Sequence, residues 1–112
     1  YRSAMGRPSP ETNRGGSWSF LSNHALALIH VGGRPESTGL ELAAAIGITE
    51  RATRRILVEL QSEGYIEREK VGRRNRYRVD VHRPLFRIAE KELTAGQLLE
   101  LVLGRQDQPE PI

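Results

Sequence analysis

The 112-residue chain contains no cysteine, a single methionine, a single tryptophan and few aromatic residues overall, which make up 5% of the sequence. The lack of cysteine excludes disulfide bonds, thiol redox chemistry and zinc sites with cysteine ligands. No apolar run approaches the length that spans a membrane, and no secretory signal segment is present. These absences favour a cytoplasmic protein with no membrane partner, and the length suits one domain with a modest core.

A catalytic arrangement is also missing. The serines have no His and Asp relay, and Gly32-Gly33 lacks the strand and the lysine of a phosphate-binding loop. His24 and His30 are isolated, with no second ligand at metal-binding spacing. The sequence therefore predicts a binding protein rather than an enzyme, with no cofactor and no metal, and it indicates no particular small-molecule effector.

Positive charge is concentrated in one part of the chain. The formal net charge of the whole protein is +3. Between Arg68 and Arg83 alone, seven basic and two acidic side chains give a net charge of +5. A basic run of this kind favours an anionic partner such as nucleic acid.

The periodicity changes from helical to extended just before this basic run. A helical pattern extends from Glu50 to Glu63, with Thr49 as its cap and Gly64 after its end. Apolar and charged residues then alternate on either side of a turn at residues 72–75, which predicts a β-hairpin with a basic tip. Arginines occupy the first half of the helix, where the helix dipole disfavours them, so a phosphate-rich partner would explain their position. The alternative is that these arginines lie on a solvated face of the helix and bind no partner.

Two shorter helices are predicted before this one, over residues 23–33 and 40–46, and Gly47 closes the second. The connection from residue 46 to the helix at Glu50 is so short that the two helices must cross steeply, as in a helix-turn-helix. A short extended pairing of residues 37–39 with the hairpin is also expected.

Several residues carry a resemblance to a known family. The helix-turn-helix signature is matched by a small residue, a turn glycine and two apolar residues at the crossing: Ala43, Gly47, Ile48 and Ile56. Thr53 stands where the signature usually has Val or Ile, and its hydroxyl is expected to bond to the carbonyl of Thr49. The run GYIEREKVGRRNRYRV then resembles the wing of bacterial winged-helix regulators of the MarR and ArsR kind. The resemblance covers residues 23–80 and implies an α+β, mainly helical, winged helix-turn-helix fold.

The resemblance also implies a function, namely sequence-specific binding of double-stranded DNA by a repressor-type transcriptional regulator. The helix from Glu50 would enter the major groove, and the wing would lie on the backbone or in the minor groove. The implied contacts are, in the helix, Thr49, Glu50, Arg51, Arg54 and Arg55, and, in the wing, Arg73, Arg74, Asn75 and Arg76.

Three alternatives remain open at this point. Arg55 projects to the flank of the helix, where a phosphate contact or a bond to Glu59 would equally explain it. A second alternative is that the wing arginines belong to a solvated hairpin, although arginines so crowded repel one another unless an anion is near. A third is that the whole domain is a winged-helix module that binds protein or the RNA backbone without reading bases.

The segment after the hairpin is predicted as an extension over residues 83–104. Pro84 is expected to stop any strand ladder, and Thr94 and Gln97 to form the capping box of a last helix that ends at Leu103. The first and last helices carry surplus apolar surface, which predicts a homodimer that reads an inverted repeat. The predicted interface residues are Leu28, Val31, Leu98, Leu101 and Val102. The alternative is that the last helix folds back over its own first helix.

The domain organisation follows from these elements. Residues 18–82 are predicted to form the winged DNA-binding domain, residues 1–17 a disordered arm and residues 105–112 a tail. Met5 is a candidate for the natural first residue, which would make residues 1–4 non-native.

Overall fold

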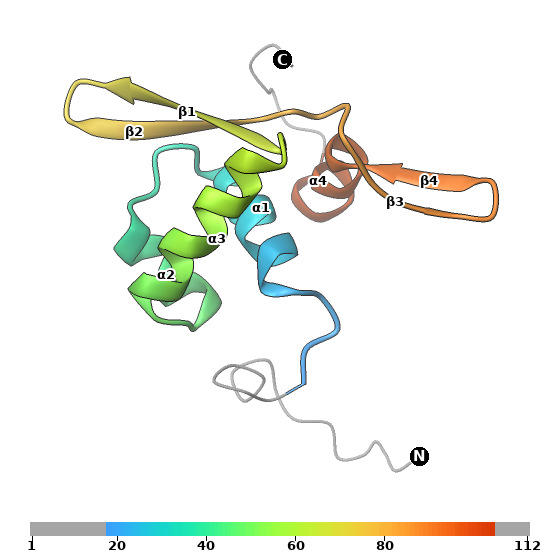
Figure 1. The fold of residues 1–112 in the computed structure, drawn as a ribbon, viewed down its shortest axis with the longest axis horizontal. Helices are drawn as coiled ribbons and strands as arrows, with labels where there is room; N and C mark the ends of the chain where they lie inside the picture. Colours follow the sequence, from blue (N-terminus) through green and yellow to red (C-terminus); the bar gives the residue numbers. More distant parts are fainter. Residues whose placement is uncertain (1–17, 105–112) are drawn as a thin grey trace.

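A computed structural model of the protein describes residues 18–104, so the predictions for the arm, for Met5 and for the tail lie outside the described residues. Within this range the chain has an α+β fold, mainly helical, with four helices and two separate β-hairpins (Figure 1). The elements are, in order, α1 (Asn23–Gly33), α2 (Gly39–Ile46), α3 (Glu50–Ser62), β1 (Ile66–Val71), β2 (Arg74–Val79), β3 (Pro84–Ile88), β4 (Lys91–Thr94) and α4 (Ala95–Leu103). No helix among residues 18–104 is both long and apolar enough to cross a membrane.

Hydroxyl side chains start all four of these helices. Ser22, Thr38, Thr49 and Thr94 each accept a hydrogen bond from a main-chain N–H in the first helical turn. Such a cap satisfies an amide that has no partner inside the helix, and each contributes about 1 kcal/mol. The capping box predicted for Thr94 and Gln97 is confirmed, and Thr38 forms a second one with Glu41.

The connection between α2 and α3 is as short as the sequence predicted. Gly47 ends α2 with a φ of 89°, a left-handed conformation that glycine adopts without strain. Its N–H and that of Ile48 both donate to the carbonyl of Ala43, at 2.8 and 3.1 Å. Thr53 is fully buried, and its hydroxyl donates to the carbonyl of Thr49 at 3.0 Å, which confirms the predicted bond.

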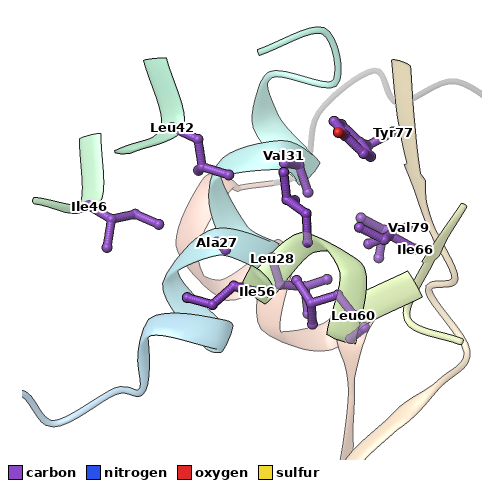
Figure 2. Packing of buried hydrophobic residues seen from close by; sticks show 12 residues of the cluster. Ala27, Leu28, Val31, Leu42, Ile46, Ile56, Leu60, Ile66, Tyr77 and Val79 are labelled. Atoms are coloured by element: carbon purple, nitrogen blue, oxygen red, sulfur yellow. The ribbon is translucent and has the colours of Figure 1, made fainter. Parts of the chain in front are cut away.

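One hydrophobic core joins these helices to the first hairpin. Leu28 and Val31 of α1, Leu42 of α2, Ile56 of α3 and Ile66 of β1 are at most 3% exposed. Figure 2 shows their side chains converging, with Tyr77 and Val79 of β2 closing one side of the cluster. Burying such side chains stabilises the fold by about 1.5–3 kcal/mol each. The core therefore fixes where α3 and the β1–β2 hairpin stand relative to one another.

The β1–β2 hairpin has a tighter turn than predicted. The strands pair antiparallel from Ile66 opposite Val79 to Val71 opposite Arg74, so the turn is only Gly72-Arg73. Arg74 and Asn75, predicted in the turn, belong to β2 because Gly72 with a φ of 65° reverses the chain within two residues. The predicted extended pairing of residues 37–39 is wrong, since these residues form no strand, and the main-chain bond between the loop and the hairpin runs from the Tyr77 N–H to the Pro35 carbonyl at 2.8 Å.

The second hairpin, β3–β4, contradicts the prediction that Pro84 ends the strand pairing. Pro84 lies at the first position of β3, opposite Thr94, where a strand tolerates a residue without an N–H. A bulge follows between Pro84 and Phe86, and the strands turn at Ala89 and Glu90. In Figure 1 this hairpin extends from the helical body away from the β1–β2 hairpin.

Helix α4 packs against α1 of the same chain. A β-carbon built on Gly32 would lie only 2.8 Å from both terminal carbons of Leu99, so the two helices approach closely there. This contact is the one expected from the alternative prediction, in which the last helix folds back over the first helix of its own chain. The prediction that Leu28 and Val31 form a dimer interface is wrong, because they are 2% and 1% exposed within the core of a single chain.

Candidate nucleic-acid interface

The first half of α3 presents its arginines on the side away from the core. The inward face of α3 consists of Thr53, Ile56, Leu57 and Leu60. With a rotation of 100° per residue, the intervening positions point outward, and Arg51, Arg54 and Arg55 are exposed. Thr49 and Glu50 at the start of the helix are exposed as well. All five predicted contact residues of α3 therefore lie on an accessible surface.

Some of these residues already have partners within the helix. The Glu50 carboxylate lies 3.3 Å from the Arg54 guanidinium, and the Thr49 hydroxyl oxygen accepts the Ala52 N–H at 3.0 Å. An exposed ion pair one helical turn apart contributes only about 0.3–0.5 kcal/mol. Arg54 can therefore exchange Glu50 for a phosphate or a base edge at little cost, while Thr49 keeps its capping role.

Arg51 and Arg55 have no such partner. No acidic group among residues 18–104 lies within 4.0 Å of either guanidinium. The alternative bond from Arg55 to Glu59 is not formed, because Glu59 instead meets His24 of α1 at 2.6 Å. Within residues 18–104, these two arginines of α3 therefore carry charges that no carboxylate compensates.

The β1–β2 hairpin divides its charges between two faces. Side chains alternate along a strand, so Tyr77 and Val79, which face the core, share one face with Arg68 and Lys70. Arg74, Arg76 and Arg78 occupy the opposite face.

Carboxylates from the same chain neutralise that opposite face. Arg78 pairs with Glu67 at 3.3 Å, and Arg76 lies 4.0 Å from Glu69. Glu36, in the loop between α1 and α2, bridges Arg76 at 3.2 Å and Arg74 at 3.4 Å. The anion that the crowded wing arginines require is therefore supplied at least partly by the protein itself.

Three further cations of the hairpin lie on β1 and at its turn. Arg68, Lys70 and the turn residue Arg73 are exposed, with no acidic group within 4.0 Å among residues 18–104. Asn75, opposite Lys70, is half-buried. Arg73 keeps the place at the tip that the sequence predicted, whereas Arg74 and Arg76 are held back against Glu36.

A surface hollow of about 410 Å³ lies between the α1–α2 loop and β2. Its lining is mostly charged and consists of Arg34, Pro35, Glu36, Ser37, Glu41, Arg74 and Arg76. The hollow marks the place where the loop meets the face of the hairpin that carries Arg74 and Arg76.

Arg83 belongs to the basic run by sequence but serves the fold. Its guanidinium donates to the Glu63 carbonyl at 2.5 Å and lies 5.7 Å from the centre of the Tyr65 ring. A cation at this end of α3 is favoured by the helix dipole. Arg83 therefore anchors the end of α3 rather than belonging to the exposed basic surface.

His30 of α1 has a half-buried imidazole ring. Burial lowers the pKa of His30 below its ordinary value, and the nearby charge of Arg34 lowers it further, while Glu41 opposes the shift. Its Nε2 atom is buried and has no hydrogen-bond partner among the described residues. The neutral imidazole is therefore the form that suits the fold.

No protein-family model and no curated protein sequence matches this chain. Within residues 18–104, no group of three His, Asp or Glu side chains is placed to hold a metal ion. The site must therefore be interpreted from its own geometry.

Sequence reasoning missed three residues of this surface. Arg68 and Lys70 belong to the basic run but are not among the predicted contacts, and the alternation along β1 gave no signal for them because it places them on the same face as Tyr77 and Val79. Glu36 gave no signal, because its partners lie 38 and 40 positions further along the chain.

Proposed function

We propose that this protein is a sequence-specific, double-stranded DNA-binding regulator with a winged helix-turn-helix architecture. In this proposal α2 and α3 form the helix-turn-helix, α3 enters the major groove, and the β1–β2 hairpin is the wing. The resemblance to bacterial regulators leads us to place it in the cytoplasm of a bacterial cell.

The observation that carries the proposal is the exposure of Arg51, Arg54 and Arg55 in the first half of α3. This half of a helix disfavours positive charge, so the arginines reduce rather than increase helix stability. An arginine can pair with guanine O6 and N7 through two hydrogen bonds, and the N-terminal half of a recognition helix is the part that reaches base edges. Binding to DNA offsets the unfavourable placement.

The hairpin supports the same proposal. Arg73, Arg68 and Lys70 have no acidic partner among the described residues, and they lie on an element that the core holds beside α3. Contacts from these side chains to phosphates would set the register of the protein on the duplex without reading its sequence.

We further propose a symmetric homodimer formed through α4. After α4 has packed on α1, Leu101 and Val102 are still 77% and 51% exposed, and Leu98 is half-buried. Neighbouring apolar side chains left in water favour association. A two-fold axis beside α4 would present two copies of α3 to successive turns of the major groove, about 34 Å apart.

A second candidate function is a module that holds a phosphate backbone, of RNA or DNA, without reading bases. The observation that favours it is the hairpin itself, whose exposed cations suit phosphates of any sequence. The two candidates differ only in whether α3 contributes base contacts.

Selection from a random pool of duplexes separates them. The purified protein is incubated with the pool, and the retained fragments are sequenced over several rounds. Our proposal predicts enrichment of an inverted repeat whose half-sites are one helical turn apart. Retention without any enriched sequence supports the backbone-holding module.

A further inference from the structure

We propose that Glu36 is a specificity-determining residue, which occupies two wing arginines in the free protein and so suppresses sequence-independent binding to DNA. This inference rests on the proposed function and adds a component to it. The carboxylate acts as an internal competitor of the DNA phosphates. It affects random duplex most, because there no base contacts hold the wing against the backbone.

The geometry of the ion pairs supports this role. One carboxylate oxygen of Glu36 lies 3.4 Å from Arg74 and the other 3.2 Å from Arg76. A single anion with two separated oxygens between two guanidinium groups is the arrangement that a backbone phosphate would take there. Glu36 therefore occupies the position of the phosphate it competes with.

The loop that carries Glu36 holds the carboxylate in place. Pro35 accepts the Tyr77 N–H from the hairpin, and the buried Ser37 bonds through both its N–H and its hydroxyl to the Arg34 carbonyl. Thr38 then starts α2 with a capping box. Glu36 thus lies between two anchored neighbours, so presenting its charge costs little additional conformational entropy.

The balance between the two anions depends on what else binds. Both arginines are about half exposed, so their ion pairs with Glu36 are weak in water and exchangeable. On random DNA, an arginine that exchanges Glu36 for a phosphate replaces one ion pair by another and gains no net charge pairing. The Glu36 carboxylate is then left beside a phosphate. On a cognate site, base contacts from α3 keep the wing at the backbone, and the exchange becomes favourable.

The test uses the variant Glu36→Gln, with binding to a fluorescent random-sequence duplex measured by anisotropy across a salt series. Each phosphate contact makes the slope of log affinity against log salt more negative by about 0.9. With affinities at 1 M salt taken as equal, one added contact raises the affinity at 0.15 M salt by roughly five-fold. We expect random-duplex affinity to rise by about five-fold for each arginine released. The slope should become steeper by about 0.9 to 1.8.

Glu90→Gln is the matched control. It removes the same charge from the turn of the other hairpin, which points away from the wing (Figure 1), and should change affinity less than two-fold. In a background of Arg74→Gln and Arg76→Gln, the Glu36→Gln change should have no effect, because the arginines it releases are gone. Glu36→Ala removes the same charge and gives the same reading if the glutamine variant folds poorly.

Two results would overturn the inference. If Glu36→Gln binds random duplex no more tightly than Glu90→Gln does, Glu36 does not compete with phosphates. If Glu36→Gln binds random duplex more weakly than the unmodified protein does, Glu36 instead positions the arginines for DNA. If the unmodified protein does not bind duplex at all, the proposed function fails, and this inference fails with it; binding by the unmodified protein with no gain in the variant removes the inference alone.

Discussion

Gly96 lies directly against the main chain of Val81: its N–H donates to the Val81 carbonyl at 2.9 Å, and a β-carbon at Gly96 would lie 2.9 Å from that same oxygen. The neighbouring residue Ala95 is fully buried and donates to the Arg83 carbonyl at 2.8 Å. These bonds attach the start of α4 to the chain just beyond the first hairpin. Residues 83–104 are therefore integrated with the helical body through α4.

We expect Gly96→Ala to destabilise the protein by about 1–3 kcal/mol, because the backbone it would strike cannot rotate away as a side chain can. Gly33→Ala is the matched control, since its β-carbon would meet Leu103 at an ordinary 3.4 Å. Urea denaturation of both variants checks the prediction. Equal stabilities would show that α4 is not held as closely as described.

The first hairpin and the helices could be predicted from the sequence because their signals are local. Caps, turn glycines and a change of period all act within a few residues of one another. The β3–β4 hairpin could not be predicted, because its turn has no glycine or asparagine. Ala89 adopts a φ of 54° there, a conformation that alanine tolerates only when the surrounding structure imposes it.

The candidate site was predictable as a set of side chains but not as a balance of charge. Alternation placed the arginines on the hairpin, whereas the carboxylate that meets two of them comes from a distant loop. The apolar pattern of α1 likewise could not show whether α4 or a second chain covers it. Long-range packing decides both questions, and it leaves Leu28 and Val31 inside one chain.

Protonation of His30 should reduce the stability of the fold. The pKa is lowered in the folded protein, so between its ordinary value near 6.5 and the lower folded value the unfolded chain binds more protons. The stability contribution of the neutral ring is therefore complete above about pH 6.5 and is lost as the pH falls through the folded pKa.

Thermal denaturation from pH 8 to pH 5 measures this effect, with His30→Gln as the comparison. The variant should show a smaller loss of stability on acidification than the unmodified protein. Parallel curves would show that His30 does not titrate differently in the two states.

Base readout should depend on α3 and not on the hairpin tip. Arg54→Ala should cost about 1–3 kcal/mol at a selected site and relax discrimination at one base pair. Arg73→Ala should weaken selected and random duplex alike and reduce the magnitude of the salt slope by about 0.9. Arg87→Ala on the second hairpin serves as the control and should change neither. A loss from Arg54→Ala that is equal on both duplexes would show that α3 does not read bases.

The dimer proposal is tested by Leu101→Glu. Because Leu101 is 77% exposed in the single chain, the charge should leave the fold intact while it prevents association through α4. Sedimentation should show a dimer for the unmodified protein at micromolar concentration and a monomer for the variant. Leu40→Glu, at a leucine that is 63% exposed on α2, is the matched control and should remain dimeric. A monomeric unmodified protein contradicts the proposal.

The most direct test of sequence-specific DNA binding is the ratio of two affinities measured side by side at 0.15 M salt. One duplex carries the sequence selected from the random pool, and the other carries the same bases in shuffled order. Specific DNA-binding proteins prefer their sites by about 10³-fold or more, and we predict a ratio in that range, with both affinities falling as salt rises. A ratio near one would contradict the account.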